Sequence, residues 1–161
     1  MDLTALANRI GETLLARHWY LATAESCTGG WAAQALTSVQ GSSHWFDRGF
    51  ITYSNQAKQE MLGVRAETLA QYGAVSEQTV IEMAAGALAR SPAQITLAIS
   101  GIAGPGGGTL DKPVGLVCLA WAVRESVPVS KAQRFQGDRE QIRRQAVESA
   151  LQGVLDVLST S

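Results

Sequence analysis

The sequence predicts one three-layer α/β/α domain, with a mixed sheet between two layers of helices. Helical and strand-like segments alternate along the chain, which favours an α/β architecture. Two segments, 95–100 and 114–123, are almost continuously apolar, as expected for strands whose faces are both covered by helices. The 161 residues suffice for a single core and contain no repeat or linker-like segment. We therefore expect one domain spanning residues 1–161.

The first third of the chain predicts two helices and two strands. Apolar residues recur at helical spacing over 3–17. A short strand follows at 20–25, and Thr28 is the candidate N-cap of a helix that ends near Thr37. Aromatic and β-branched residues over 48–54 predict the second strand.

Three helices are expected in the middle of the chain. Ser54 or Asn55 caps the first, and a short second helix covers 65–71. Ser76 caps a third helix, which ends near Arg90 because a proline follows soon after.

The last third of the chain predicts the remaining strands and a long helix. The apolar strands 95–100 and 114–123 are followed by a strand at about 129–136. Asp138 and Gln141 have the spacing of a capping box for the C-terminal helix. This order of elements implies a mixed sheet between helix layers.

Charge and composition exclude several classes of function. The formal net charge of −1 leaves no strong field to attract nucleic acid or anionic lipid. The apolar runs are too short to cross a bilayer, and the first residues do not resemble a signal peptide, so we expect a cytoplasmic protein without nucleic-acid or membrane partners. Two His and two Cys at unrelated spacings form no pattern of metal ligands, so we expect reduced cysteines and no metal.

Ser26 is the first candidate for catalysis. It follows a predicted strand and precedes a helix, and Gly29 and Gly30 allow close approach of the backbone. Free N–H groups of such a turn can hold an oxyanion, and the helix dipole favours negative charge there. Ala24 and Thr28 stand where the nucleophile elbow of α/β-hydrolases has glycines. The alternative is that Ser26 and Thr28 only cap the helix.

A serine nucleophile needs a base, and Lys58 is the candidate. Burial, together with a place in the first turn of a helix, favours the neutral form of a lysine. Tyr53, at the carboxyl end of the preceding strand, can relay a proton or orient the lysine. The alternative is a solvated lysine and a capping tyrosine. His18 and His44 have no feature that places them beside Ser26.

The glycine-rich segment 100–108 lies between two predicted strands. Neither Gly-Lys-Ser/Thr nor a helix follows it, which excludes a Walker A loop and a Rossmann pyrophosphate site. It is either a tight connection or a backbone that wraps a polar ligand. Arg139, in the first turn of the last helix, can bind a phosphate together with the helix N–H groups. Arg143 and Arg144 follow it, and they either share in such a function or line the solvated face of an amphipathic helix.

Five segments, in order, resemble the CinA carboxy-terminal-domain family. They are TAESCTGG (23–30), GFITYSN (49–55), GAVS (73–76), SGIAGPGG (100–107) and KPVG (112–115). The resemblance covers nearly the whole chain and implies a three-layer α/β/α fold, a homodimer, no metal and no cofactor. Stand-alone members are nicotinamide-nucleotide amidases. The resemblance therefore implies a small-molecule nucleotide substrate, nicotinamide mononucleotide, which is hydrolysed to nicotinate mononucleotide and ammonia.

The resemblance also implies the catalytic residues. The family's serine, tyrosine and lysine fall on Ser26, Tyr53 and Lys58. We expect Ser26 to attack the carboxamide after losing its proton to Lys58, while N–H groups between Thr28 and Gly30 hold the oxyanion. Gly106 stands where the family often has an acidic or polar residue, which affects only the details of its loop. The residues expected to contact the substrate are Thr28, Gly29, Gly30, Asn55, Gly104, Gly106, Gly107, Thr109 and Arg139.

Two alternatives to this hypothesis stay open. A non-catalytic nucleotide-binding or regulatory paralogue would keep the same pocket, and ammonia release from nicotinamide mononucleotide distinguishes it. Cys27 is an alternative nucleophile because a thiolate is more nucleophilic than a hydroxyl. The sensitivity of Cys27 to alkylating reagents decides the second case.

Overall fold

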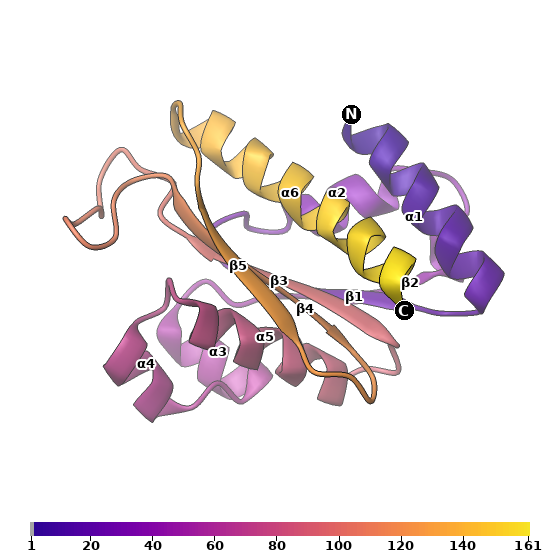
Figure 1. Cartoon of the computed structure of the whole chain (residues 1–161), viewed down its shortest axis with the longest axis horizontal. Coiled ribbons are helices and arrows are strands. Elements are labelled where there is room, and N and C mark those ends of the chain that lie inside the picture. Colours follow the sequence, from indigo (N-terminus) through magenta and orange to yellow (C-terminus); the bar gives the residue numbers. More distant parts are fainter. Residues whose placement is uncertain (1) are drawn as a thin grey trace.

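A five-stranded mixed sheet forms the middle layer of the molecule (Figure 1). The computed structural model describes residues 2–161. The strands are β1 (Leu21–Glu25), β2 (Phe46–Ile51), β3 (Ile95–Gly101), β4 (Leu116–Val123) and β5 (Val129–Arg134), in the spatial order β2-β1-β3-β4-β5. β1 pairs in parallel with β2 and β3, whereas β4 is antiparallel to β3 and to β5. The predicted mixed sheet is confirmed.

Helices cover both faces of this sheet, as the sequence predicts (Figure 1). One layer contains α1 (Leu3–Arg17), α2 (Trp31–Thr37) and α6 (Arg139–Thr160), and the other contains α3 (Asn55–Leu62), α4 (Ala66–Tyr72) and α5 (Glu77–Ala89). A 3-10 turn at Ser42–His44 precedes β2. Separate apolar clusters fill the space on the two sides of the sheet. The apolar strands β3 and β4 are buried along nearly their whole length, because each contributes side chains to both clusters.

Local capping signals place most helix starts correctly. The hydroxyls of Ser54 and Ser76 accept N–H bonds at the starts of α3 and α5. Asp138 and Gln141 form the predicted capping box of α6. The prediction of Thr28 as the N-cap of α2 is wrong, because α2 begins after Gly30.

The bounds of β2 and β4 differ from the predicted ones. β2 covers 46–51 rather than 48–54, since its neighbour β1 ends at Glu25 and the chain then turns towards the cap of α3. β4 begins at Leu116 rather than 114. Gly115 has φ +95, and a Cβ at this position would lie 2.1 Å from the Phe135 carbonyl oxygen.

The chain leaves β1 and β2 towards opposite faces of the sheet. α2 follows β1 on one face, whereas α3 follows β2 on the other. In open α/β sheets such a reversal opens a crevice at the carboxyl ends of adjacent parallel strands. Ser26 follows β1 at this edge, and the segment that carries Tyr53 and Lys58 follows β2.

α3 packs unusually closely on α5. A Cβ built on Gly86 in α5 would lie 1.9 Å from the carbonyl oxygen of Leu62, the last residue of α3. Only a glycine permits this approach of backbone to helix. The position of α3 therefore depends on the absence of a side chain at Gly86.

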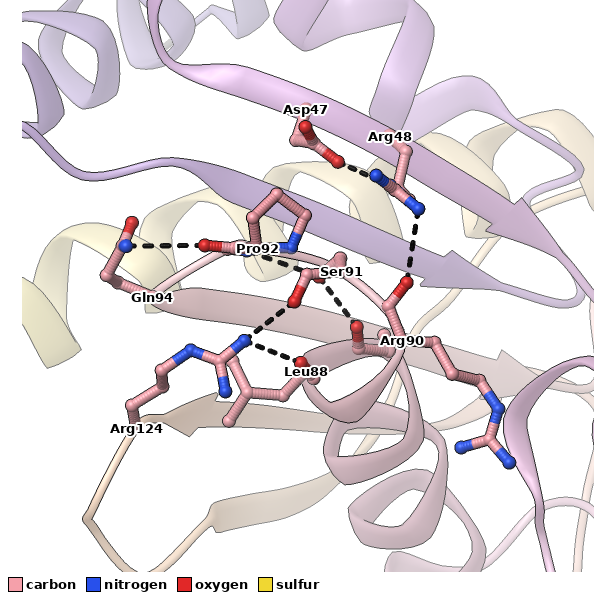
Figure 2. Close-up of polar contacts among 10 residues, drawn as sticks. Asp47, Arg48, Leu88, Arg90, Ser91, Pro92, Gln94 and Arg124 are labelled. Atoms are coloured by element: carbon pink, nitrogen blue, oxygen red, sulfur yellow. Dashed lines mark hydrogen bonds and ion pairs between the residues drawn. The ribbon is translucent and has the colours of Figure 1, made fainter.

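Arginines close the C-terminus of α5 at the amino ends of the parallel strands (Figure 2). The Arg124 guanidinium donates to the carbonyls of Leu88 and Ser91 at 2.8 and 2.7 Å. Arg48 donates to the carbonyl of Arg90 at 3.2 Å. These carbonyls have no partner within the helix, so the cations satisfy them and complement the negative end of the helix dipole.

No helix within residues 2–161 is long and apolar enough to span a membrane.

Candidate active site

Ser26 and Lys58 meet at the carboxyl edge of the sheet. The Lys58 Nζ lies 3.1 Å from the Ser26 Oγ, and both side chains are buried. The Ser26 N–H donates to the carbonyl of Ile99 in β3, which fixes the serine at the end of β1. The predicted nucleophile and base are therefore in direct contact, although they lie 32 residues apart in the sequence.

Lys58 occupies a pocket of oxygen atoms from which water is excluded. Its Nζ also donates to the carbonyls of Thr52 and Tyr53, at 3.1 and 3.2 Å, and Lys58 forms no ion pair with any residue from 2 to 161. Burial lowers the pKa of Lys58 below its ordinary value. A neutral amine has two N–H groups, which suit the two carbonyls, and a lone pair, which is then left for the Ser26 hydroxyl.

A buried carboxylate, missed in the sequence, organises the start of α2. Glu25 is 1% exposed and has no cationic partner among residues 2–161. One carboxylate oxygen accepts from the Thr28 hydroxyl at 2.6 Å and from the N–H groups of Gly30 and Ala32 at 3.2 and 2.9 Å. The other accepts from the Ala33 N–H at 3.0 Å. Glu25 therefore caps α2 from the preceding strand.

This arrangement corrects the expected oxyanion donors. The N–H of Gly30 is bound to Glu25, and that of Gly29 donates to the Ser26 carbonyl at 3.0 Å. Their φ angles of +105 and +58 explain why glycine is needed at both positions. Within residues 2–161, the N–H groups of Cys27 and Thr28 donate to no other residue. They are the free donors nearest Ser26 in the chain.

The alternative nucleophile Cys27 is poorly suited to attack. Burial raises the pKa of its thiol to about 12, despite the partly opposing charge of Arg143. At neutral pH the group is then almost entirely protonated, and the thiol form is a weak nucleophile. The geometry favours Ser26, whose hydroxyl contacts a base.

A cavity of about 230 Å³ opens beside this pair. Cys27 and Tyr53 line one side of the cavity. The glycine-rich segment 100–108, called the glycine loop from here on, lines another side with Gly104 and Gly106, and Arg139 from α6 closes the cavity. Gly107 also lines this cavity. A groove of about 480 Å³ between β5 and α6 contains none of the predicted site residues. Neither Ser26 nor Lys58 lines the smaller cavity, but Cys27 follows Ser26 in the chain and Tyr53 contacts both reactive side chains through its carbonyl, so this cavity is the candidate substrate site.

Tyr53 contacts the reactive pair through its backbone. Its carbonyl lies 3.2 Å from the Lys58 Nζ and 3.4 Å from the Ser26 Oγ. The phenol is exposed, and its oxygen accepts from Arg139 at 3.3 Å. The predicted orienting role therefore falls on the carbonyl in this structure, whereas the hydroxyl lies beside the arginine.

Of the remaining residues predicted to contact the substrate, Arg139 lines the cavity, whereas Asn55 and Thr109 do not. Arg139 donates to the Gly104 carbonyl at 2.9 Å and so lies against the glycine loop. Asn55 is exposed in the first turn of α3. Thr109 is tied into its own turn, since its N–H donates to Lys112 and its hydroxyl accepts from the Lys112 N–H, and it does not line the cavity.

Arg143, for which the sequence left a functional role and a solvated helix face open, contacts backbone carbonyls next to Ser26. Its Nε donates to the Cys27 carbonyl at 3.0 Å and its Nη2 donates to the Thr28 carbonyl at 3.2 Å. The guanidinium also lies over the Trp31 ring, 5.5 Å from its centroid. Arg143 lies one helical turn after Arg139, which indicates that both face the same side of α6. The carbonyls that it binds lie far away in the sequence and could not be inferred from this spacing.

Residues 2–161 contain no group of three or more His, Cys, Asp or Glu side chains placed to hold a metal ion.

Comparisons with known proteins agree with this picture. The chain is 53% identical to the nicotinamide-nucleotide amidohydrolase PncC of Escherichia coli (strain K12) over 151 residues, which cover 94% of this chain and 92% of that protein. It is 49% identical to the protein of the same name from Pseudomonas putida over 155 residues, 96% of each chain. The solved structure of the competence/damage inducible protein CihA from Agrobacterium tumefaciens matches with a TM-score of 0.95 at 48% identity, covering 99% of this chain and 96% of that one.

Residues 3–158 match the family described as CinA C-terminal domain. This match, the fold and the sequence identities to relatives agree over nearly the full length. The chain therefore belongs to the CinA C-terminal domain family.

Proposed function

We propose that this protein hydrolyses the carboxamide of nicotinamide mononucleotide to give nicotinate mononucleotide and ammonia. The observation that carries the proposal is the buried contact of 3.1 Å between the Lys58 Nζ and the Ser26 Oγ. A serine hydroxyl beside a desolvated lysine is a nucleophile with its base. The names of the relatives from Escherichia coli and Pseudomonas putida supply the substrate.

In the acylation step, neutral Lys58 takes the proton of the Ser26 hydroxyl while the Oγ attacks the carboxamide carbon. The carbonyl oxygen becomes an oxyanion, which the free N–H groups of Cys27 and Thr28 can stabilise. The tetrahedral intermediate collapses with loss of ammonia, to which the Lys58 ammonium returns the proton. The product is an ester between Ser26 and the nicotinoyl group, and Lys58 is neutral again.

In the second step, water hydrolyses this ester. Neutral Lys58 accepts a proton from the water, and the resulting hydroxide attacks the ester carbon. Breakdown of the second tetrahedral intermediate releases nicotinate mononucleotide, and Ser26 regains its proton from Lys58. One water is consumed and one ammonia is formed in each cycle.

The substrate's phosphate is assigned to the cavity wall formed by Arg139. The guanidinium can bind a phosphate oxygen in two-point fashion, and the glycine loop offers backbone N–H groups without side chains in the way. The homodimer and the cytoplasmic location are proposed on the family resemblance. Light scattering of the purified protein tests the dimer.

The proposed function is tested by measuring ammonia release from nicotinamide mononucleotide. Ser26→Ala should lower kcat by at least about a thousandfold, because the variant has no nucleophile. Calorimetry should show that it still binds the nucleotide, since the hydroxyl contributes little to ground-state affinity.

Cys27→Ala is the matched control, because it changes the next residue and leaves the Ser26–Lys58 pair intact. It should keep most of the wild-type activity. An active Ser26→Ala protein beside a dead Cys27→Ala protein would reverse the assignment of the nucleophile. A wild-type protein that binds the nucleotide without releasing ammonia would identify the non-catalytic paralogue.

A further inference from the structure

The segment 26–30, called the nucleophile turn from here on, is held from two sides by opposite charges. Glu25 binds N–H groups at and beyond the C-terminal end of the turn, on Gly30, Ala32 and Ala33. Arg143 binds carbonyl groups inside the turn and comes from α6, far away in the sequence. The mechanism above uses the turn but gives no role to Arg143.

The Arg143 guanidinium is aimed at the turn by several contacts. It bridges two consecutive carbonyls, those of Cys27 and Thr28, at 3.0 and 3.2 Å. Its position over the Trp31 ring leaves it little freedom to rotate. It forms no ion pair with a carboxylate within residues 2–161. Two donors in a fixed planar fork fit this task, and a lysine ammonium on a flexible stem does not reproduce it.

Peptide planarity converts these contacts into directions for N–H groups. In a trans peptide the C=O and the following N–H point in opposite directions. The bond from Arg143 to the Cys27 carbonyl therefore fixes the direction of the Thr28 N–H. In the same way, the bond from the Gly29 N–H to the Ser26 carbonyl fixes the direction of the Cys27 N–H.

Within residues 2–161, these two N–H groups donate to no other residue. Thr28 is fully buried, and a buried N–H without a partner is costly. Cys27 lines the cavity beside the nucleophile. A pair of adjacent free donors next to a serine that contacts its base is the arrangement required to stabilise a tetrahedral oxyanion.

We propose that Arg143 is a positioning residue for acyl transfer: by binding the Cys27 and Thr28 carbonyls it holds the nucleophile turn, and through the Cys27 carbonyl it directs the free Thr28 N–H towards the substrate's developing oxyanion. The inference rests on the proposed amidohydrolase function. Arg143 acts through the backbone and does not touch the reacting atoms.

The test compares carboxamide and thiocarboxamide forms of nicotinamide mononucleotide. Sulfur is larger than oxygen and accepts hydrogen bonds weakly, so a site with well-directed oxyanion donors prefers the oxygen substrate. In Arg143→Met we expect kcat for the carboxamide to fall about ten- to a hundredfold with little change in KM. The oxygen-to-sulfur ratio of kcat should fall at least about fivefold, because the Thr28 N–H that loses its direction acted mainly on the oxygen substrate.

Arg144→Met is the matched control. Arg144 is the next residue on α6, is exposed, and pairs only weakly at 3.5 Å with Glu148. The Arg144→Met variant should keep the wild-type kcat and the wild-type oxygen-to-sulfur ratio of kcat. Arg143→Lys keeps the charge but can satisfy only part of the two-carbonyl contact, so it should behave more like Arg143→Met than like wild type. It also carries the test if the methionine variant fails to fold.

Equal losses on both substrates, with an unchanged ratio, would show that Arg143 only supports the fold and would overturn the proposal. Wild-type kcat and a wild-type oxygen-to-sulfur ratio in Arg143→Lys would contradict the claim that the contact with both carbonyls is needed. The ratio is measured in parallel on p-nitrophenyl acetate and its thiono analogue, whose acyl transfer to Ser26 uses the same turn. If wild type acylates from these esters but releases no ammonia from the nucleotide, the proposed function fails while the role of Arg143 is still decided. If wild type acylates from neither substrate, both fail.

Discussion

Arginine side chains bind backbone carbonyls at both ends of the sheet, with different results. At the amino ends of the parallel strands, Arg124 and Arg48 bind carbonyls at the end of α5 and just beyond it (Figure 2). At the carboxyl ends, Arg143 binds the nucleophile turn and Arg139 binds the glycine loop. The chemical contact is the same, a guanidinium on main-chain oxygens.

The difference lies in what each contact leaves behind. At the end of α5 the arginines satisfy carbonyls that need partners, and the result is a closed helix terminus. Around the nucleophile turn, free N–H groups and a buried Lys58 without an ion pair remain beside a cavity. The first end is arranged for stability, and the second tolerates unsatisfied groups that are useful in a reaction.

Lys58→Arg gives the largest expected effect. Arginine keeps a positive charge but cannot release a proton near neutral pH, so it cannot act as the base. We expect kcat for ammonia release to fall by at least about a thousandfold, nearly as much as in Lys58→Ala. Lys131→Arg, at an exposed position on β5, should be silent. Substantial activity in Lys58→Arg would mean that position 58 supplies only a fixed charge.

Arg139→Ala should change affinity rather than chemistry. Loss of a charge-assisted phosphate contact costs about 1.5–3 kcal/mol, or roughly ten- to a hundredfold in Kd. Titrations of wild type and variant with nicotinamide mononucleotide and with its phosphate-free riboside measure the effect. The Kd of the mononucleotide should rise far more than the Kd of the riboside. If binding of both ligands weakens equally, the phosphate site is assigned to the loop around Gly106 instead of Arg139.

The lowered pKa of Lys58 predicts a pH dependence of activity. Only the neutral amine acts as a base, so kcat/KM should rise with pH and level off above the pKa of Lys58, which lies below the ordinary 10.5. A pH profile of ammonia release provides the check. A rate that keeps rising up to the ordinary lysine range would show that Lys58 is not desolvated in solution.

The same pKa shift predicts a pH dependence of stability with a defined sign. Between the lowered pKa of folded Lys58 and the ordinary 10.5, the unfolded chain binds more protons than the folded one. The free energy of unfolding of wild type should therefore rise with pH in this window relative to Lys58→Met. Urea unfolding of both proteins at neutral and alkaline pH tests this, and parallel curves would contradict it.

Arg124→Ala should give the smallest effect and acts at the closed end. Its exposed guanidinium makes two carbonyl bonds, so we expect a loss of about 0.5–1 kcal/mol in the free energy of unfolding. The kcat for ammonia release should stay within about twofold of wild type, because the residue is far from the site. A large loss of kcat would show that the two ends of the sheet are not independent.

Much of the fold was predictable because its signals are local. Continuous apolar runs gave β3 and β4, and the spacing of Asp138 and Gln141 gave the start of α6. The start of α2 was missed because its cap is a carboxylate from the preceding strand rather than a neighbouring hydroxyl. Capping rules consider only nearby side chains, so they point to the Thr28 hydroxyl.

The sequence pointed to Ser26 and Lys58 as candidate reactive groups, and it did not point to the contacts that hold the turn around Ser26. Ser26 and Lys58 lie in segments that resemble a family, and their contact agrees with the chemistry expected of them. Arg143 contacts a carbonyl 116 residues away, and no spacing rule covers such a distance. On a helix surface its charge looks like any other solvated cation.

The close approach of α3 to α5 has a consequence for how the protein tolerates mutation. Replacing a helical glycine by alanine normally favours the helix by about 1 kcal/mol. At Gly86 the added methyl would meet the Leu62 carbonyl oxygen, so α3 would have to shift, and α3 carries Lys58. A displacement of about 1 Å at a catalytic group can cost a hundredfold in rate. A substitution that improves helix propensity, far from any substrate atom, is thus expected to slow proton transfer between Lys58 and Ser26.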